Sequence, residues 1–526
     1  MKFLKVSNIK VNIEDDENKA FLLARKAAGV SDKEIKNKKI IKLSIDARNK
    51  NEIHKIYTVG LYLNEYLKKR KNVTVYDKEP EYNFKSTGTL SLNHRPVIVG
   101  FGPAGMFCGY MLAQFGYKPI IIERGSRVEE RTEKINRFWK EGKLDTECNV
   151  QFGEGGAGTF SDGKLNTQIK DREHRIHLVL ETFVKFGAKE NILYDAKPHI
   201  GTDVLSKVVK NIREYIGQKG GTFLFDTALV SIEYDNNKLK RLQLSDGTYI
   251  DTDLCILAIG HSARDTFEML HKKNVSMEQK PFAVGVRVEH QQKEINKSQY
   301  GFDDNRLGAA SYKLTYKTQK GRGVYSFCMC PGGYVVNASS EKEHLVVNGM
   351  SYNARAGINA NSAIVVTVTP ADFNSDHPLA GVNFQRNLEN RAFIEGNGKI
   401  PIQKLKDFKE LKASVNIGAI EPSSKGATSF SDINKILPEF ICDSIKEGME
   451  HFGKIIEGFD RDDVILSAVE SRTSSPVRII RNENFQSNIS GLFPAGEGAG
   501  YAGGITSAAI DGIKIFEYIA KNYKPF

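Results

Sequence analysis

The sequence predicts an α/β fold with α+β additions, and three observations support this class. A short apolar run at 97–99 is followed by a glycine pattern at 100–105, an apolar-periodic segment and a second apolar run at 120–122. This order of strand, tight turn, helix and strand is typical of one unit of a Rossmann-like parallel sheet. A strand, a glycine turn and a helix return at 489–512, and strand-like runs dominate 265–465. We therefore expect a parallel-sheet domain that is discontinuous in sequence and carries an inserted, mainly antiparallel domain.

The segment that precedes this domain, 1–90, predicts a small α+β domain of its own. Helical spacing over 18–28 ends at Gly29, and Ser31 to Glu34 form a capping box for a short second helix. Strand-like runs flank these helices at 3–13, 40–47, 53–63 and 72–76. Residues 77–92 contain proline, glycine and serine and predict a linker.

Periodicity and glycine breaks predict the elements of the remaining chain. Helices are expected at 127–142, 173–186, 203–219, 384–394 and 433–457. Strands are expected at 192–196, 222–225, 229–234, 239–244, 254–259, 282–288, 323–327, 333–338, 345–350 and 363–368. We divide the chain into an N-terminal domain (1–90), two parts of the parallel-sheet domain (91–264 and 466–526) and an inserted substrate or cap domain (265–465).

The glycine pattern after the first parallel strand favours a dinucleotide site. Gly100 allows the tight turn, Gly102 lets backbone approach a pyrophosphate, and Gly105 allows close packing of helix on strand. The N–H groups at the start of that helix then face the phosphates. Glu123 ends the next strand, where a carboxylate can accept the ribose hydroxyls of an adenosine; the alternative is a glycine-rich packing turn. We assign cofactor contacts here to Gly100, Gly102, Pro103, Ala104, Gly105, Glu123 and Arg124.

A second glycine-rich stretch, 152–164, has five glycines among thirteen residues. Such a loop lets backbone wrap closely around a flat or phosphorylated ligand. Its two phenylalanines, Phe152 and Phe160, argue against the alternative of a flexible surface linker. The strand at 254–259 ends in glycine and small polar residues, which suits a strand end against a nucleotide. We expect ligand contacts from Gly155, Gly156, Gly158, Gly163, Lys164 and Gly260.

The C-terminal stretch separates FAD from NAD, because FAD also carries a ribityl chain and an isoalloxazine ring. The strand that ends at Gly496 places Glu497 where its carboxylate can accept ribityl hydroxyls. Gly503, Gly504 and Ile505 place backbone N–H groups at the start of the final helix. Such groups stabilise the negative charge that develops at the N1/C2=O edge of a reduced flavin. The sequence therefore predicts non-covalent FAD.

Composition fits a protein of two or three domains, with 526 residues of which 40% are hydrophobic and 26% charged. No apolar run approaches the roughly 18 residues of a membrane helix. Six scattered cysteines without C-x-x-C favour a reducing cytoplasm. Of the net charge of +11, +8 lies in 1–90, where we prefer a solubilising lysine-rich surface to one that binds nucleic acid.

Three stretches, in order along the chain, resemble the FAD-binding motifs of the glutathione-reductase-like, two-domain flavoprotein superfamily: VIVGFGPAGM…IIIER, LCILAIGHSARD and GLFPAGEGAGYAGGITSAAIDG. Longer segments resemble a bacterial family of uncharacterised FAD-dependent dehydrogenases with an extra N-terminal domain: SIDARNK, NVQFGEGGAGTFSDGKLNT, YSFCMCPGGYVVNAS, NGMSYNARAGINANSAIVV and ESRTSSPVRI. The resemblance covers essentially the whole chain and implies a flavin and a redox role, but no substrate. Many superfamily members carry aspartate where this chain has Glu497.

These observations predict a cytoplasmic FAD-dependent oxidoreductase that transfers hydride between flavin and a small organic substrate in the inserted domain. The chain has no second βαβ nucleotide unit of the kind that two-nucleotide reductases use, so either NAD(P)H visits transiently or another donor serves. The alternative function is an RNA- or protein-partner-binding flavoprotein, for modification or sensing, that uses 1–90.

Three residues are candidates for catalysis. Strand alternation puts the thiols of Cys328 and Cys330 on one side of a strand that should face the flavin, as a redox thiol or a polar wall. The alternative is two small core residues. Arg472 can bind an anionic substrate or the pyrophosphate, or form a loop ion pair. No cluster has metal-ligand spacing.

Overall fold

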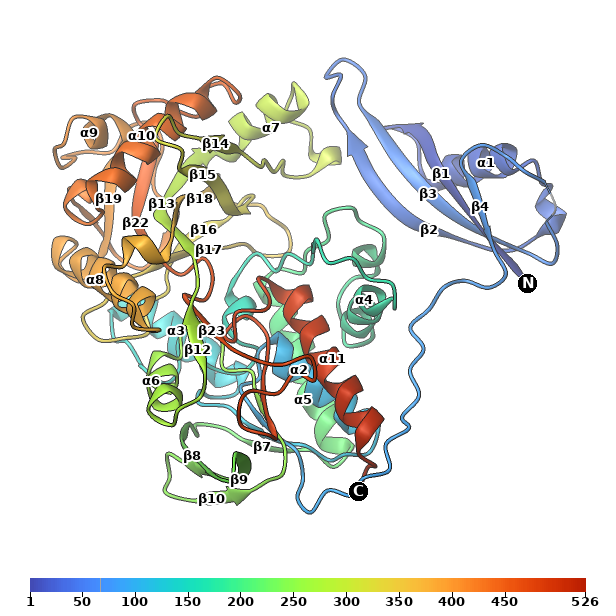
Figure 1. Ribbon diagram of the computed structural model, residues 1–526. Helices are drawn as coiled ribbons and strands as arrows, with labels where there is room; N and C mark the ends of the chain where they lie inside the picture. Colours follow the sequence, from blue (N-terminus) through green and yellow to red (C-terminus); the bar gives the residue numbers. More distant parts are fainter. Residues whose placement is uncertain (67) are drawn as a thin grey trace.

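The protein, described here from a computed structural model, is defined over residues 1–66 and 68–526 (Figure 1). The N-terminal domain forms a four-stranded antiparallel sheet in the order β2-β3-β1-β4, and α1 packs on it. Its elements are β1 (Lys2–Asn12), α1 (Glu17–Ala28), β2 (Ile35–Asp46), β3 (His54–Leu63) and β4 (Val73–Tyr76). Gly29 ends α1 in the left-handed conformation, as the sequence predicts. The capping box at Ser31 is present, but it begins only a 3-10 turn because β2 starts at Ile35.

Two backbone hydrogen bonds connect this domain to the rest of the molecule. Leu43 N of β2 donates to Tyr194 O over 2.7 Å, and Ala196 N donates to Leu43 O over 2.8 Å. The prediction of a strand at 192–196 is wrong. A 3-10 turn occupies Glu190–Leu193, and it is followed only by an isolated β-bridge between Asp195 and Leu43, which the two hydrogen bonds form. The linker then passes along the final helix, where the N–H groups of Thr87 and Gly88 donate to Ala520 O.

A five-stranded parallel sheet in the order β24-β11-β5-β6-β7 forms the centre of the larger body. Its strands are short: β5 (Val97–Val99), β6 (Ile120–Ile122), β7 (Thr222–Leu224), β11 (Cys255–Leu257) and β24 (Leu492–Pro494). The last strand comes from the far end of the chain, so the domain is discontinuous, as predicted. This sheet confirms the α/β class.

The two faces of this sheet are covered by different elements because successive strand residues point to opposite sides. Ile98, Ile121 and Ile256 pack against helices, whereas Val97, Ile122 and Leu257 pack against a small antiparallel sheet and α6. The helices on the first face are α2 (Pro103–Gln114), α4 (Arg175–Lys185), α5 (Thr202–Gln218) and α11 (Ile505–Asn522). The second face is covered by α6 (Arg264–Lys272), β8 (Leu229–Asp235) and β9 (Lys238–Leu244). The domain also contains β10 (Tyr249–Asp251), which pairs with β9, and α3 (Val128–Glu141).

The inserted segment forms a seven-stranded sheet in the order β14-β15-β18-β13-β22-β19-β21, antiparallel except for β19–β21. Its strands are β13 (Phe282–Gln291), β14 (Thr315–Lys317), β15 (Gly323–Cys330), β18 (Asn359–Val368), β19 (Ile400–Lys404), β21 (Thr428–Phe430) and β22 (Ile465–Glu470). Because β22 pairs centrally in this sheet, we move the proposed end of the inserted domain from residue 465 to beyond Glu470.

Smaller elements complete this domain. Its helices are α7 (Gln292–Tyr300), α8 (Ala380–Glu395), α9 (Leu405–Lys409) and α10 (Glu439–Gly453). The helix predicted at 433–457 is shorter than expected because Pro438 is the N-cap of α10. The remaining strands are β12 (Met277–Gln279), β16 (Tyr334–Asn337), β17 (Val347–Met350), β20 (Ser424–Lys425) and β23 (Val477–Ile479). In the described part of the chain, no helix has the length and hydropathy needed to cross a bilayer.

A buried ion cluster joins the parallel-sheet domain to the inserted one. The carboxylate of Glu389, on α8, accepts two hydrogen bonds from Arg264 of 2.7 and 2.9 Å and two from Arg472 of 2.6 and 2.9 Å. Ser471 donates a fifth over 2.7 Å. Burial by itself would raise the pKa of Glu389, but the two guanidinium groups outweigh it and hold that pKa well below its usual range. The cluster is therefore charged and must remain paired.

Glu389→Gln tests this cluster. The substitution removes the negative charge and leaves two buried guanidinium groups undercompensated, so the free energy of unfolding should fall by about 3 kcal/mol. The matched control is Glu141→Gln, which breaks an exposed pair with Lys143 and should cost less than about 1 kcal/mol. Urea unfolding of both variants measures the difference. Equal losses would contradict a structural role for the buried cluster.

A second buried acid, Glu289 of β13, titrates near neutrality. Oε2 accepts from Asn359 Nδ2 over 2.9 Å and from Ser423 N over 2.8 Å, whereas Oε1 has no partner among the described residues. Burial outweighs these hydrogen bonds and raises the pKa of Glu289 from 4.5 to about 7. The folded protein therefore holds a proton here that the unfolded chain has lost by neutral pH.

Glu289→Gln gives this protonation a measurable consequence. Between the unfolded and folded pKa values the folded state binds more protons, so the free energy of unfolding of the wild type falls as pH rises. The amide has no proton to lose. From about pH 5 to about pH 8, the variant should therefore gain about 2 kcal/mol relative to wild type. Urea unfolding midpoints of wild type and variant at the two pH values test this. If the stability difference between Glu289→Gln and wild type were as independent of pH as that of the control Glu141→Gln, the assignment would be contradicted.

Candidate functional site

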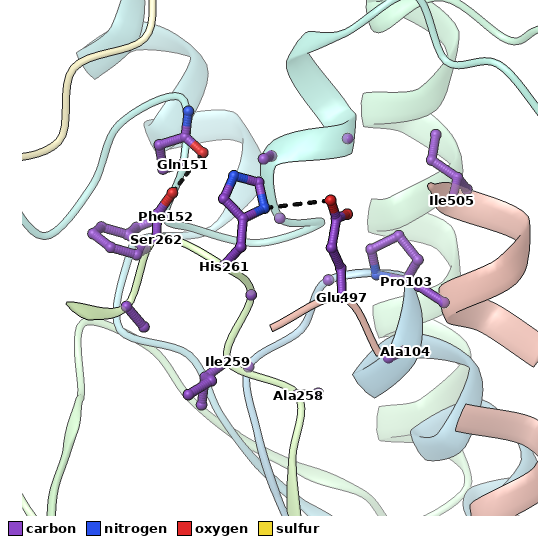
Figure 2. Close-up of a pocket in the computed structure, with 18 of the residues that line it drawn as sticks. Pro103, Ala104, Gln151, Phe152, Ala258, Ile259, His261, Ser262, Glu497 and Ile505 are labelled. Carbon is purple, nitrogen blue, oxygen red and sulfur yellow. Dashed lines mark hydrogen bonds and ion pairs between the residues drawn. The ribbon is translucent and has the colours of Figure 1, made fainter. Parts of the chain in front are cut away.

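One cavity of about 370 Å³ lies where the carboxyl ends of the parallel strands meet the inserted domain. Val99, Ile122 and Ala495 line it from the ends of β5, β6 and β24, and Phe327 and Asn348 line it from the inserted domain. Figure 2 shows Pro103 and Ala104 at the start of α2 on one side and Ile505 at the start of α11 nearby. Ligands of open parallel sheets bind at this edge.

Most residues predicted to contact a cofactor line this cavity. They are Gly100, Gly102, Pro103, Ala104, Glu123, Arg124, Gly156, Gly158, Gly163, Lys164, Gly260, Glu497, Gly503, Gly504 and Ile505. Three others lie behind the wall. A Cβ at Gly105 would lie 2.0 Å from Gly100 O, one at Gly155 2.2 Å from Thr159 Oγ1, and one at Gly496 2.7 Å from Ala104 Cβ. These glycines permit close packing and do not face the cavity.

The turn between β5 and α2 leaves room for a ligand. Gly100 has a φ of +95°, which only glycine adopts readily. Gly102 is the N-cap of α2 and supplies no side-chain cap, so the first N–H groups of the helix lack that partner. A Cβ at Gly102 would have only Gly156 Cα within 4 Å, at 3.7 Å. The space in front of this helix start is therefore open.

Glu123 is held by backbone N–H groups. Its Oε2 accepts from Phe101 N over 2.9 Å, and its Oε1 accepts from Gly125 N and Gly153 N over 3.0 Å each. The carboxylate therefore connects the β5 turn to the start of the glycine-rich loop. A carboxylate has about four acceptor positions, so a position is left for a hydroxyl of a ligand.

A histidine and an acid from opposite ends of the chain meet at the cavity. His261 Nδ1, after β11, lies 3.5 Å from Glu497 Oε1, after β24, and Figure 2 shows the two side chains facing one another. His261 Nε2 is buried and has no partner among the described residues. A buried polar atom without a partner is rare.

Lys164 reaches the cavity from the glycine-rich loop within a polar cluster. Its Nζ lies 3.3 Å from Asp162 Oδ2 and donates to Met329 O. Arg355 makes a bidentate pair with Asp162, at 2.5 and 3.0 Å. Burial alone would raise the pKa of Asp162, but Lys164 and Arg355 lower it to about 2. Lys164 is thus a fixed positive charge at the cavity wall.

The candidate catalytic residues lie in different surroundings. Arg472 lines the cavity, but its guanidinium is bonded to Glu389 and, over 2.6 Å, to Ser340 Oγ. Burial, with Arg264 beside it, lowers the pKa of Arg472. Cys328 lines the cavity, whereas Cys330 is fully buried behind it. Among the described residues, no group of three or more His, Cys, Asp or Glu side chains forms a metal site.

Sequence reasoning missed a buried cluster behind this wall. Arg287 Nε donates to Glu470 over 2.9 Å, and its Nη1 donates to Asn361 over 2.7 Å. Its Nη2 donates to Asn348, which lines the cavity, over 3.3 Å. One signal could have found it. Arg287 is the single Lys or Arg in β13, a strand in which every residue but the last is buried, and a buried charge requires partners.

The fold and the cavity together define a dinucleotide-type α/β protein with an inserted antiparallel domain. Residues 281–473 match the family described as FAD-dependent protein, C-terminal domain-like, and residues 3–62 match a Domain of unknown function (DUF8436). An uncharacterized protein of Clostridium beijerinckii is 48% identical over an alignment of 534 positions that covers 99% of each chain. The chain belongs to the same family as this Clostridium protein.

Solved structures show weaker likeness. A glycerol-3-phosphate dehydrogenase from Bacillus halodurans complexed with FAD has a TM-score of 0.36 and 10% identity, over 81% of this chain and 64% of that one. A flavin-dependent brominase has a TM-score of 0.37 and 11% identity, over 81% and 80%. Because these TM-scores are low, we assign the fold from the strand order of this chain and not from the solved structures.

Glu123→Gln tests how the site is held together. The amide would present N–H groups to one set of backbone donors, so at least one buried N–H would lose its acceptor. We expect a loss of about 2 kcal/mol in the free energy of unfolding and faster proteolysis within 152–164. The nearby Glu147→Gln, whose carboxylate is mostly exposed, is the matched control and should change neither. If Glu123→Gln kept both the stability and the protease resistance of wild type, the role of Glu123 in holding the site together would be contradicted.

Proposed function

We propose that the protein is an FAD-dependent oxidoreductase that holds FAD non-covalently in this cavity and transfers hydride between flavin and a small organic substrate. One observation carries the proposal. A single cavity runs along two helix starts without side-chain caps, α2 and α11, and the carboxylates of Glu123 and Glu497 also line it. The match of the inserted domain to FAD-dependent proteins supports the same cofactor.

The residues present fit this group. The open space at Gly102 suits a pyrophosphate against the N–H groups of α2, and Glu123 suits an adenosine ribose. His261 and Glu497, whose Nδ1 and Oε1 lie 3.5 Å apart, both line the cavity and offer hydrogen-bonding groups to the ribityl chain. Gly504, the N-cap of α11, supplies no side-chain cap, so the helix start can bind the flavin's N1/C2=O edge. The pyrophosphate, the adenosine ribose, the ribityl chain and the N1/C2=O edge of FAD thus each have a group of suitable chemistry.

Bound FAD would supply the acceptor or donor of the hydride. The chain's own groups supply orientation and charge. The positive start of α11, together with Lys164, stabilises negative charge at that end of the cavity. Phe327 and Asn348 of the inserted domain close the same cavity from the opposite side, which is where we place the substrate. No second βαβ nucleotide unit is present in the sequence, so NAD(P)H as the donor would have to visit this cavity transiently.

The absorbance of the purified protein is the first test, because bound FAD gives visible bands. Gly102→Ala should fill the space in front of α2 and weaken FAD binding at least about tenfold, a loss of about 1.4 kcal/mol. The protein without FAD should keep its unfolding midpoint, since the new methyl meets only one atom at van der Waals distance.

Gly217→Ala is the matched control, because its Cβ would meet nothing within 4 Å on helix α5. It should leave FAD affinity unchanged in equilibrium titrations followed by flavin fluorescence. A wild-type protein that neither contains FAD nor takes it up would refute the proposal. Equal affinity of Gly102→Ala and wild type would refute the assignment of the pyrophosphate to α2.

A further inference from the structure

Two cysteines of β15 lie at the boundary between the cavity and the core of the inserted sheet. Cys328 is partly exposed and lines the cavity, and Cys330 is buried two residues later. Cys328 has a φ of +43°, a left-handed conformation that costs a non-glycine residue energy. The pairing of β15 with β18 shifts between Phe327 and Cys330. Strand alternation is thus broken here, and the bulge turns Cys328 toward the cavity.

Two fixed positive charges flank this pair. Lys164 Nζ, at the cavity wall, donates to the carbonyl of Met329, between the two cysteines. Arg287 Nη1 donates to Cys328 O over 3.1 Å and lies 3.9 Å from Cys330 Sγ. Cations near a thiol favour its thiolate form. Among these cations, Arg287 is anchored by Glu470 and cannot move away without leaving that carboxylate buried and unpaired.

The pKa values of the two thiols shift in opposite directions. A hydrogen bond from the thiol of Cys330, helped by Lys164 and Arg287, holds the pKa of Cys328 well below its usual range despite burial. The same hydrogen bond to the Cys328 thiolate, together with burial, holds the pKa of Cys330 well above its usual range. Cys330 Sγ also donates to Cys328 O over 3.2 Å, so the two residues are in contact. The lowered pKa favours Cys328 as the member of the pair that forms the thiolate, the form that takes part in disulfide formation.

The other four cysteines do not line the cavity. All are buried, and burial raises the pKa of the Cys108, Cys255 and Cys442 thiols, that of Cys442 to about 12. Buried thiols of this kind are inert. Of the six cysteines, all within the described residues, only Cys328 lines the cavity, and Cys330 is in contact with it.

The pair lies at the end of the cavity where α11 begins. Thr506 Oγ1 of α11 donates to Leu165 O over 2.8 Å, beside Lys164, and Lys164 in turn bonds to the backbone between the cysteines. A Cβ on Gly158 would lie 3.2 Å from Ile505 Cγ1, so the glycine-rich loop packs directly on the helix start. This is the end that we assign to the isoalloxazine ring.

We propose that Cys328 and Cys330 form a dithiol/disulfide couple that exchanges two electrons with FAD bound in the cavity; this rests on the proposed function. In the oxidising direction the Cys328 thiolate and the Cys330 thiol form an S–S bond. Two electrons and the proton of Cys330 pass to oxidised FAD, which becomes the anionic reduced form. In the reverse direction reduced FAD returns two electrons and that proton, and the S–S bond breaks.

A disulfide between residues two apart closes a small ring and is strained. Strained disulfides have higher, more oxidising potentials and are readily reduced. Such a bond stabilises the fold little, which suits a couple that is cycled and not a structural link.

Electron counting on the holoprotein tests the couple. The protein is oxidised with diamide, desalted and titrated anaerobically with dithionite while flavin absorbance is followed. Wild type should take up about four electrons per FAD, two for flavin and two for the disulfide. Cys328→Ser and Cys330→Ser should each take up about two, and the control Cys442→Ser about four.

Alkylation after unfolding gives a second readout that does not depend on flavin. All six cysteines of wild type should be alkylated when it is reduced, and two fewer after oxidation, with peptide mapping placing the loss at Cys328 and Cys330. If the protein bound flavin but took up only about two electrons and lost no alkylated thiols on oxidation, the dithiol/disulfide couple would be overturned and the proposed function would stand. Absence of flavin would instead overturn the proposed function, and the electron exchange with it.

Discussion

The structure depends on one buried carboxylate. Glu389 stands on α8 of the inserted domain and accepts hydrogen bonds from Arg264, at the start of α6, and from Arg472, just after β22. Because charges of this kind cannot be left unpaired in the interior, the three elements that carry them are held at fixed separation. The cavity lies beside this junction, and Arg472 is part of its wall. The same contact therefore orients the two large sheets and shapes the site.

The cavity is a consequence of the way the two sheets meet. Parallel strands end together at one edge, and α2 and α11 begin there with glycines in place of capping side chains. The inserted sheet closes the space with Phe327, Cys328 and Asn348. Behind that wall, Arg287 and Glu470 form a second buried pair that supports the bulge of β15. Open backbone donors lie on one side, and a charged wall that carries Cys328 lies on the other.

Much of this arrangement could be predicted from local patterns. The turn at Gly100, the acid at Glu123 and the final helix after Gly504 follow from spacing alone, because each pattern expresses a backbone requirement within a few residues. The prediction of a strand at 192–196 was wrong because Ile192 and Leu193 are themselves part of a 3-10 turn, in which Ile192 is buried. The second N-terminal helix shortened to one turn because pairing with β3 begins at Ile35. In the second case pairing with a distant strand outweighed local preference.

The sequence by itself determined the order of the elements and the glycines that shape the helix starts, since these depend on φ/ψ restrictions and hydrophobic period. The tertiary structure alone decided which charges meet. Glu389 lies 125 residues from Arg264, and Arg287 lies 183 residues from Glu470. No local pattern encodes such partners. It is burial that forces each charge to find one, and folding of the two sheets brings the partners together.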